Sequence, residues 1–189
     1  MIFPGLSGGS GKGYVKALVK TLLNDDFTVV VFHNRGVEMT EYTSPQFAKL
    51  SSSFEIETAM DHIQKEMGEE ADLVGVGLSM GANMMMRVAG EQGNKTKFKA
   101  MVAVNNPFDL WLAISLMRGK TYEKYLAKEL RQNLVIRDEK DMGEKEKAVY
   151  KEMVTKFGLD LAKLGGVESW RDFDEWFTIK VNPEFKSAA

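Results

Sequence analysis

The chain has 189 residues, 44% of them hydrophobic, which is the size of one domain with a substantial core and leaves no room for a second domain of ordinary size. Its 25 Lys and Arg residues nearly balance 27 Asp and Glu residues and are scattered along the chain, so we expect no nucleic-acid partner. The sequence contains no cysteine, which excludes disulfides, thiol catalysis and cysteine-ligated metal.

A glycine-rich loop lies close to the first residue. The short apolar pair Ile2-Phe3 precedes residues 4–13, Pro-Gly-Leu-Ser-Gly-Gly-Ser-Gly-Lys-Gly, and an amphipathic helical pattern follows over residues 14–23. The spacing disfavours a phosphate-binding loop, because Leu6 occupies the position of its first glycine and Gly13 replaces the hydroxyl residue that would hold magnesium. We favour a strand end followed by a loop whose backbone N–H groups stabilise a developing negative charge.

Strand and helix patterns then alternate. Residues 27–32, 73–78 and 100–104 are short apolar runs that predict buried parallel strands, while residues 54–67 and 82–90 carry helical patterns. This alternation predicts crossover units on a mostly parallel sheet of about four strands, counting the short strand at residues 2–3.

The run at residues 73–78 breaks into Gly77-Leu78-Ser79-Met80-Gly81 and continues as a helix. Gly-x-Ser-x-Gly between a strand and a helix is the pattern of a nucleophile elbow, in which the serine sits on a strained turn with its hydroxyl exposed. Small residues are needed because the two backbones approach closely, so that a β-carbon at Gly77 or Gly81 would clash. Ser79 is therefore the candidate nucleophile.

Strand signals stop after residue 107. Helical patterns cover residues 110–117, 122–134, 144–157 and 170–178. Two interpretations remain open: these helices simply cover the sheet, or they form a cap that shapes an apolar acyl pocket. We assign residues 1–107 to the central core and residues 108–189 to a helical cap or lid region of the same domain.

The chain resembles the abhydrolase-domain family of α/β-hydrolases, in the branch of medium-chain esterases and acylglycerol lipases. Five segments carry the resemblance in the family's order: Pro-Gly-Leu-Ser-Gly-Gly-Ser at 4–10 with Tyr14-Val15, Val-Val-Phe-His-Asn-Arg-Gly at 30–36, the elbow with Ala82-Asn83, Asn-Pro-Phe-Asp-Leu at 106–110, and Phe-Asp-Glu at 173–175 with Thr178. The resemblance implies that Ser79 is the nucleophile, that the backbone N–H groups of Leu6 and Met80 form the oxyanion hole, and that the helices after Pro107 are the cap.

Measured against the family pattern, we expect a truncated α/β-hydrolase core. The resemblance places further strands before the Pro-Gly-Leu segment, and the catalytic Asp and His after the last matching segment. The triad Asp and His are not found in this sequence. His33 and His62 are the available histidines, and we interpret His33 as part of a structural loop and His62 as an edge-of-core or solvated residue. Asp109 is expected to cap the helix that begins at Leu110.

Three hypotheses for function remain. The chain is part of an esterase or lipase that hydrolyses acyl-ester or lipid substrates through Ser79; or it is a non-catalytic structural or interaction subunit; or a second polypeptide supplies the missing strands, Asp and His. In each, missing segments or a protein partner cover the sheet edges, which otherwise invite pairing with another chain. No cofactor or metal site is expected, since two unconnected histidines form no ligand set. No apolar run approaches the roughly 20 residues that span a bilayer, so any membrane contact is made from the surface or through a partner.

Overall fold

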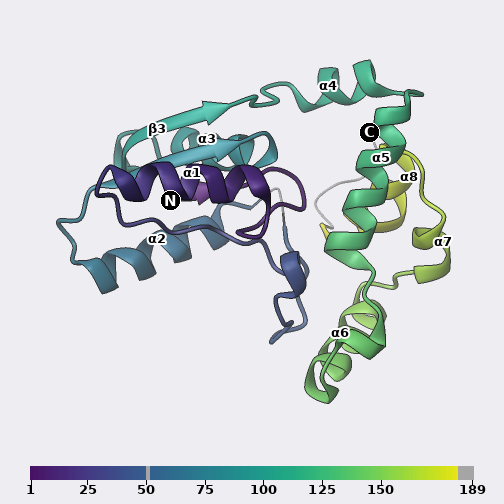
Figure 1. Cartoon of the computed structure of the whole chain (residues 1–189). Helices are drawn as coiled ribbons and strands as arrows, with labels where there is room; N and C mark the ends of the chain where they lie inside the picture. Colours follow the sequence, from purple (N-terminus) through teal and green to yellow (C-terminus); the bar gives the residue numbers. More distant parts are fainter. Residues whose placement is uncertain (50–51, 183–189) are drawn as a thin grey trace. The chain divides into compact units, whose positions relative to one another are not determined.

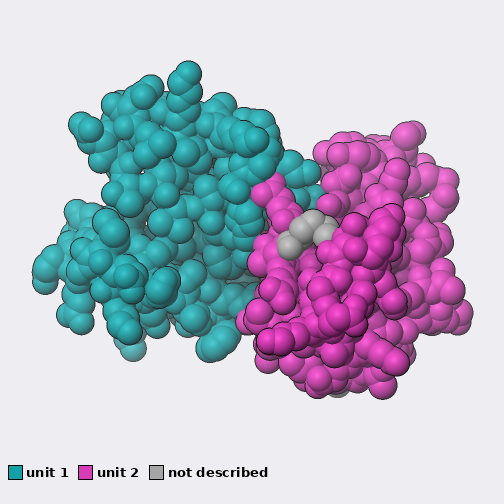
Figure 2. Space-filling view, turned by 60° about the horizontal axis from the view of Figure 1, so that its bottom comes forward, with its two compact units in different colours: residues 1–33, 50–108 teal, residues 34–49, 109–189 magenta. Residues whose placement is uncertain are grey.

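The computed structural model describes residues 1–49 and 52–182, which divide into two compact units (Figure 2). The first unit contains Met1–His33 and Leu50–Phe108, and the second contains Asn34–Lys49 and Asp109–Ala189. The chain thus passes between the units after residues 33, 49 and 108. Each unit is built from two separate stretches of sequence.

The first unit holds a parallel sheet with the strand order β1-β2-β3 (Figure 1). The strands are β1 (Ile2–Phe3), β2 (Leu73–Leu78) and β3 (Phe98–Val104). Ile2 lies opposite Val76 in the β1 pair, and Val76 lies opposite Val102 in the β3 pair. The strand that precedes Ser79 is therefore the central one, with a neighbour on each side.

The expected strand at residues 27–32 is an extended segment joined to the sheet by a single parallel bridge between Ile2 and Val31. The N–H of Ile2 donates to the Val30 carbonyl at 2.8 Å, and the N–H of Phe32 donates to the Ile2 carbonyl at 2.9 Å. Because β1 has two residues, it offers no longer ladder to pair with. The segment is also not buried as expected, since Phe27 is 47% exposed.

Helices α1 (Gly13–Asn24), α2 (Phe54–Met67) and α3 (Met80–Gln92) complete the first unit together with the short turn η2 (Gly93–Lys95). Apolar residues of α2 and α3 pack against the sheet in one cluster, in which the rings of Phe3 and Phe98 meet edge to face at 5.9 Å. The buried members of this core are Phe3, Ile56, Met60, Leu73, Met84, Met85, Val88 and Phe98.

Strand β3 is not buried as its apolar sequence predicted. Ala100, Val102 and Val104 lie on one face because side chains alternate along a strand, and all three are exposed. Val102 is 52% exposed and Val104 is 41% exposed. The apolar pattern correctly predicts a strand but not the exposure of its side chains.

The second unit is helical. Its elements are η1 (Val37–Met39), α4 (Leu110–Met117), α5 (Thr121–Leu130), η3 (Arg131–Val135), η4 (Glu139–Asp141), α6 (Glu144–Lys156), α7 (Leu161–Gly165), α8 (Trp170–Phe173), η5 (Asp174–Thr178) and α9 (Ile179–Val181). The helices predicted over residues 122–134 and 170–178 each change into a π-helical turn, η3 and η5. Such one-turn π segments are uncommon and cannot be read from apolar spacing.

A buried ion pair joins the two stretches of the second unit. Arg137 and Glu146 contact each other with side chains 5% and 6% exposed. The Arg137 guanidinium also donates to the carbonyls of Gly36 at 2.6 Å and Thr40 at 2.7 Å, and the Glu146 carboxylate accepts from the N–H of Tyr42 at 3.1 Å. Burying two charges is tolerable only when their hydrogen-bonding capacity is satisfied, and this pair meets that condition.

Aromatic side chains surround this ion pair. The guanidinium of Arg137 lies 4.3 Å from the centre of the Tyr42 ring, and the Tyr42 hydroxyl donates to the Leu134 carbonyl at 3.0 Å. Burial raises the pKa of Tyr42 to about 12. Phe47 packs its ring 5.2 Å from that of Phe177 and 5.9 Å from that of Phe157. Residues 34–49 therefore supply both a polar and an aromatic part of the second unit's core.

Replacing Glu146 by Ala is expected to destabilise the second unit by about 3–5 kcal/mol, because the Arg137 charge would remain buried without its partner. Urea unfolding followed by circular dichroism measures the loss. The matched control is Glu144→Ala, which removes an exposed partner of Lys147 two residues away on the same helix and should leave the unfolding midpoint unchanged. Equal effects of the two substitutions would contradict the role assigned to the buried pair.

Candidate active site

Ser79 occupies a strained turn between strand β2 and helix α3. Its backbone has φ 52° and ψ −117°, a conformation that L-residues rarely adopt. The N–H of Ser79 donates to the Val104 carbonyl at 2.8 Å, and its carbonyl accepts from the N–H of Asn83 at 3.1 Å. The turn is thus held to β3 on one side and to the first turn of α3 on the other, with the Ser79 side chain exposed.

The glycines on both sides of Ser79 are required by close backbone approach. A β-carbon at Gly77 would lie 2.8 Å from the Ala82 nitrogen, and one at Gly81 would lie 2.5 Å from the carbonyl carbon of Phe3. Both separations are shorter than real side chains allow, and the obstructing atoms are backbone atoms that cannot rotate away. The crowding predicted for the pentapeptide is confirmed, and it brings the elbow against the end of β1.

The glycine-rich loop lies beside Ser79. A β-carbon on Gly5 would come within 3.4 Å of the Ser79 β-carbon, so the loop backbone runs next to the serine. The loop is folded by a hydrogen bond from the N–H of Gly8 to the Gly5 carbonyl at 2.9 Å. Ser7, in the middle of this turn, is buried and has φ 53°. The glycine-rich loop and the elbow thus lie side by side in the first unit.

Tyr14 holds this loop in place, a role that the sequence analysis did not predict. Its hydroxyl accepts a hydrogen bond from the N–H of Gly5 at 3.1 Å, and it lies so close to Gly8 that a β-carbon there would overlap it. An aromatic hydroxyl in the first turn of the helix that follows a glycine-rich loop is the signal that could have indicated this contact.

Leu6 and Met80 carry the backbone N–H groups that are expected to form the oxyanion hole. Within the described part of the chain, the structure records no hydrogen-bond acceptor for the backbone N–H of Leu6 or of Met80. Met80 is the first residue of α3, where backbone N–H groups have no partner inside the helix and the helix dipole favours negative charge. Both residues are partly exposed.

The candidate acid and base residues are engaged elsewhere. The Nε2 atom of His33 accepts from the N–H of Ser10 at 2.9 Å, which supports the interpretation of His33 as a loop residue. His62 is exposed on α2. The Asp109 carboxylate accepts from the N–H of Leu112 at 2.8 Å, which confirms its role as the N-cap of α4. The Ser79 hydroxyl has no hydrogen bond recorded to any described side chain.

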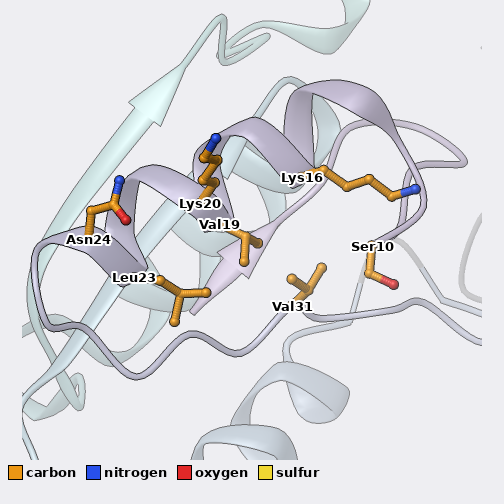
Figure 3. A pocket seen from close by; sticks show the side chains of 7 residues that line it. All are labelled: Ser10, Lys16, Val19, Lys20, Leu23, Asn24 and Val31. Atoms are coloured by element: carbon orange, nitrogen blue, oxygen red, sulfur yellow. The ribbon is translucent and has the colours of Figure 1, made fainter.

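A shallow pocket of about 390 Å³ lies on the first unit between α1 and the extended segment that contains Val31 (Figure 3). Val19 and Leu23 from α1 face Val31 across it, with Lys16 and Lys20 at its side. Ser79, Leu6 and Met80 are not among its lining residues. The pocket is therefore separate from the elbow. Among the described residues no group of His, Asp and Glu side chains has a metal-binding arrangement.

A parallel sheet with a strained Gly-x-Ser-x-Gly turn between strand and helix defines a hydrolase-type α/β architecture. The chain belongs to the α/β-hydrolase family: the family model described as the alpha/beta hydrolase fold matches residues 1–151. No solved structure matches the chain at a significant level.

Curated relatives include lipid-processing enzymes. The chain is similar to the Embryogenesis-associated protein EMB8 of Picea glauca, with 32% identity over 137 residues that cover 70% of this chain and 30% of that protein. It is 31% identical over 112 residues to the Monoacylglycerol lipase of Saccharomyces cerevisiae, covering 59% of this chain and 25% of that enzyme. It is 30% identical over 148 residues to the Medium-chain fatty acid ethyl ester synthase/esterase 2 of the same yeast, covering 76% of this chain and 32% of that enzyme. The chain therefore spans about a third or less of the length of these three relatives.

The elbow geometry generates a prediction with an internal control. Gly81→Ala is expected to lower the free energy of unfolding by several kcal/mol, because its β-carbon would collide with the Phe3 backbone. Gly90→Ala, in the same helix with open space around its β-carbon, should instead raise it by about 0.5–1 kcal/mol through improved helix propensity. Thermal unfolding of both variants measures the difference. Similar shifts for the two variants would refute the close approach at the elbow.

Proposed function

We propose that Ser79 is the nucleophile of an acyl-ester hydrolase that acts on lipid substrates. The single observation that carries the proposal is the strained, exposed Ser79 at the end of the central strand, beside a glycine-rich loop. In this reaction the Ser79 oxygen attacks the ester carbonyl and the alcohol leaves with a proton, after which water releases the acid. The lipase and esterase among the relatives support an acyl-ester substrate.

The oxyanion that forms in this attack needs donors aimed at it. We assign that role to the backbone N–H groups of Leu6 and Met80, which belong to the loop and the helix that flank Ser79. Both N–H groups are without a recorded acceptor in the described part of the chain, and this supports the assignment. Removal of one such donor typically costs about two to three orders of magnitude in turnover.

The proposal assigns the catalytic base to a histidine other than His33 and His62. His33 is held by the loop backbone and His62 lies exposed on α2. Serine is a weak nucleophile without a base, and loss of the histidine lowers turnover by about 10⁶-fold in a well-measured serine hydrolase. A complete triad needs a His and an Asp that the described residues do not place beside Ser79, and we assign the role of the cap to the helices of the second unit.

A second candidate function is a non-catalytic subunit of a larger assembly. The observation that favours it is the exposed apolar face of β3, formed by Ala100, Val102 and Val104. Such a face at the edge of a sheet is suited to be covered by a partner protein. In that case Ser79 would stay inert in every context.

A fluorophosphonate probe, which reacts with activated serines, separates these proposals. The isolated chain of 189 residues is expected to remain unlabelled for want of a base. The protein expressed from its intact gene in its own cells is expected to be labelled, and Ser79→Ala should abolish the labelling. The matched control is Ser115→Ala, an exposed serine on α4 whose loss should leave labelling unchanged.

Two results would decide against the hydrolase proposal or its details. Absence of labelling in the intact-gene protein, together with co-purification of a stable partner, would favour the non-catalytic subunit. Strong labelling of the isolated chain that disappears in Ser79→Ala would show that this chain holds its own base.

A further inference from the structure

Helix α4 has an unusual composition for an exposed helix. Its eight residues, Leu-Trp-Leu-Ala-Ile-Ser-Leu-Met, include no charged side chain, and none of them is buried. Trp111 is 71% exposed, Leu112 is 49% exposed and Leu116 is 61% exposed. Leaving this much aromatic and aliphatic surface in water is unfavourable by about 25 cal/mol per Å², so the face is suited to be buried against an apolar surface.

The exposed apolar residues of this helix share one side of it. Ala113, Ile114 and Met117 are the partly buried residues, and they share one side of the helix. Trp111, Leu112 and Leu116 fall on the opposite side. The Asp109 N-cap fixes the start of the helix, so the exposed face belongs to an ordered element within the second unit.

The charges that follow this helix are of one sign at the surface. Between residues 110 and 128 the exposed charged side chains are Arg118, Lys120, Lys124 and Lys128. The single acidic residue in this stretch, Glu123, is buried, where its carboxylate accepts from the N–H of Gly119 at 2.6 Å and of Trp170 at 3.3 Å.

One of these four cations is paired, because Lys124 contacts the exposed Glu168 at 2.6 Å. Arg118, Lys120 and Lys128 form no ion pair with any residue that the structure describes. Arg118 shares the lining of one hollow with Asp172 and Asp174, whereas Lys120 and Lys128 lie outside that hollow. The stretch therefore combines an apolar face with two positive charges, on Lys120 and Lys128, that are available for an anionic surface.

Aromatic residues with polar groups extend this surface onto α5. Tyr122 is 60% exposed and Tyr125 is 55% exposed, and their rings stack with centroids 6.2 Å apart. Tyrosine and tryptophan are enriched where a protein meets the boundary between lipid and water, because one part of the side chain is apolar and the other is polar.

We propose that Trp111, Leu112 and Leu116 of α4 dock on the surface of a lipid bilayer that contains anionic lipids. An apolar face next to Lys and Arg residues is the pattern of a helix that lies in the interface plane, and its basic residues complement anionic headgroups. None of the described helices has the length and apolar character needed to cross a membrane. A second copy of this chain is the other occupant that the apolar face could take, and self-association is an outcome of the experiment.

Co-sedimentation with vesicles tests the apolar face. The isolated chain is expected to bind vesicles of phosphatidylcholine with about one-third phosphatidylserine more tightly than vesicles of phosphatidylcholine alone. The double substitution of Trp111→Ser and Leu116→Ser should weaken binding at least about tenfold, because the inserted apolar area is lost. The matched control is Phe54→Ser, which removes a 66% exposed aromatic ring from α2 and should leave binding unchanged.

The charge contribution is tested separately. Lys120→Gln and Lys128→Gln are each expected to weaken binding to the anionic vesicles by about fivefold, with little change for the neutral ones. Lys65→Gln, on the exposed end of α2, is the control and should have no effect. Raising the salt concentration should reduce binding of the unsubstituted chain in the same direction.

Three outcomes would overturn the proposal: no preference for anionic vesicles, an equal loss in the Phe54→Ser control, or self-association of the chain that Trp111→Ser and Leu116→Ser abolish. The last would assign the face to a second copy of this chain. Because the measurement is of binding and involves no hydrolysis, its result is independent of the role proposed for Ser79. Circular dichroism of each variant confirms that the fold is retained.

Discussion

The closeness of three backbones at the carboxyl end of β2 is the constraint on which the site depends. Helix α3 begins against the end of β1 because Gly81 has no side chain. Gly77 likewise allows the backbone at the end of β2 to approach the backbone of Ala82. This approach leaves Ser79 no relaxed conformation and forces its positive φ. It also sets the glycine-rich loop beside the serine. The position of the loop and the exposure of Ser79 thus follow from one packing arrangement.

The second unit relies on a different kind of interaction. Its core combines an aromatic cluster around Phe47 with the buried Arg137 and Glu146 pair, and both join residues 34–49 to the helices. An apolar core tolerates several packings, whereas a buried charge pair is satisfied in few arrangements. The ion pair therefore fixes which loop conformation accompanies the helices, while the rings of Tyr42 and Phe47 add apolar contacts with Tyr150 and Phe177 of the helices.

Features set by local sequence were predictable. The elbow, the spans of α1, α2 and α4, and the Asp109 cap follow from apolar spacing, turn residues and capping chemistry, which act over a few residues. The candidate site around Ser79 could be located from the same signals, because an apolar strand pattern, a glycine-rich turn and a helical pattern follow one another there. The glycines flanking it were predicted for the steric reason that the structure confirms.

Features that depend on distant partners were not predictable. The exposure of β3 and of Phe27 depends on which elements cover them, and an apolar strand sequence carries no information about that. The π-helical turns at residues 131–135 and 174–178 depend on packing at the ends of helices. The grouping of residues 34–49 with the helical unit rests on contacts such as Tyr42 with Glu146, which are 104 positions apart.

The second unit is built from two separate stretches of sequence, and this limits how its helices can be exchanged between relatives as a module. A cassette cut at residue 109 would carry the helices but leave behind Tyr42, Phe47 and the carbonyls that receive Arg137. Its loop and its helices must change together, since a new helical segment would meet an unmatched loop. Diversity in this part of the molecule is therefore expected to arise by paired substitutions in two distant stretches of sequence, and not by exchange of one continuous block.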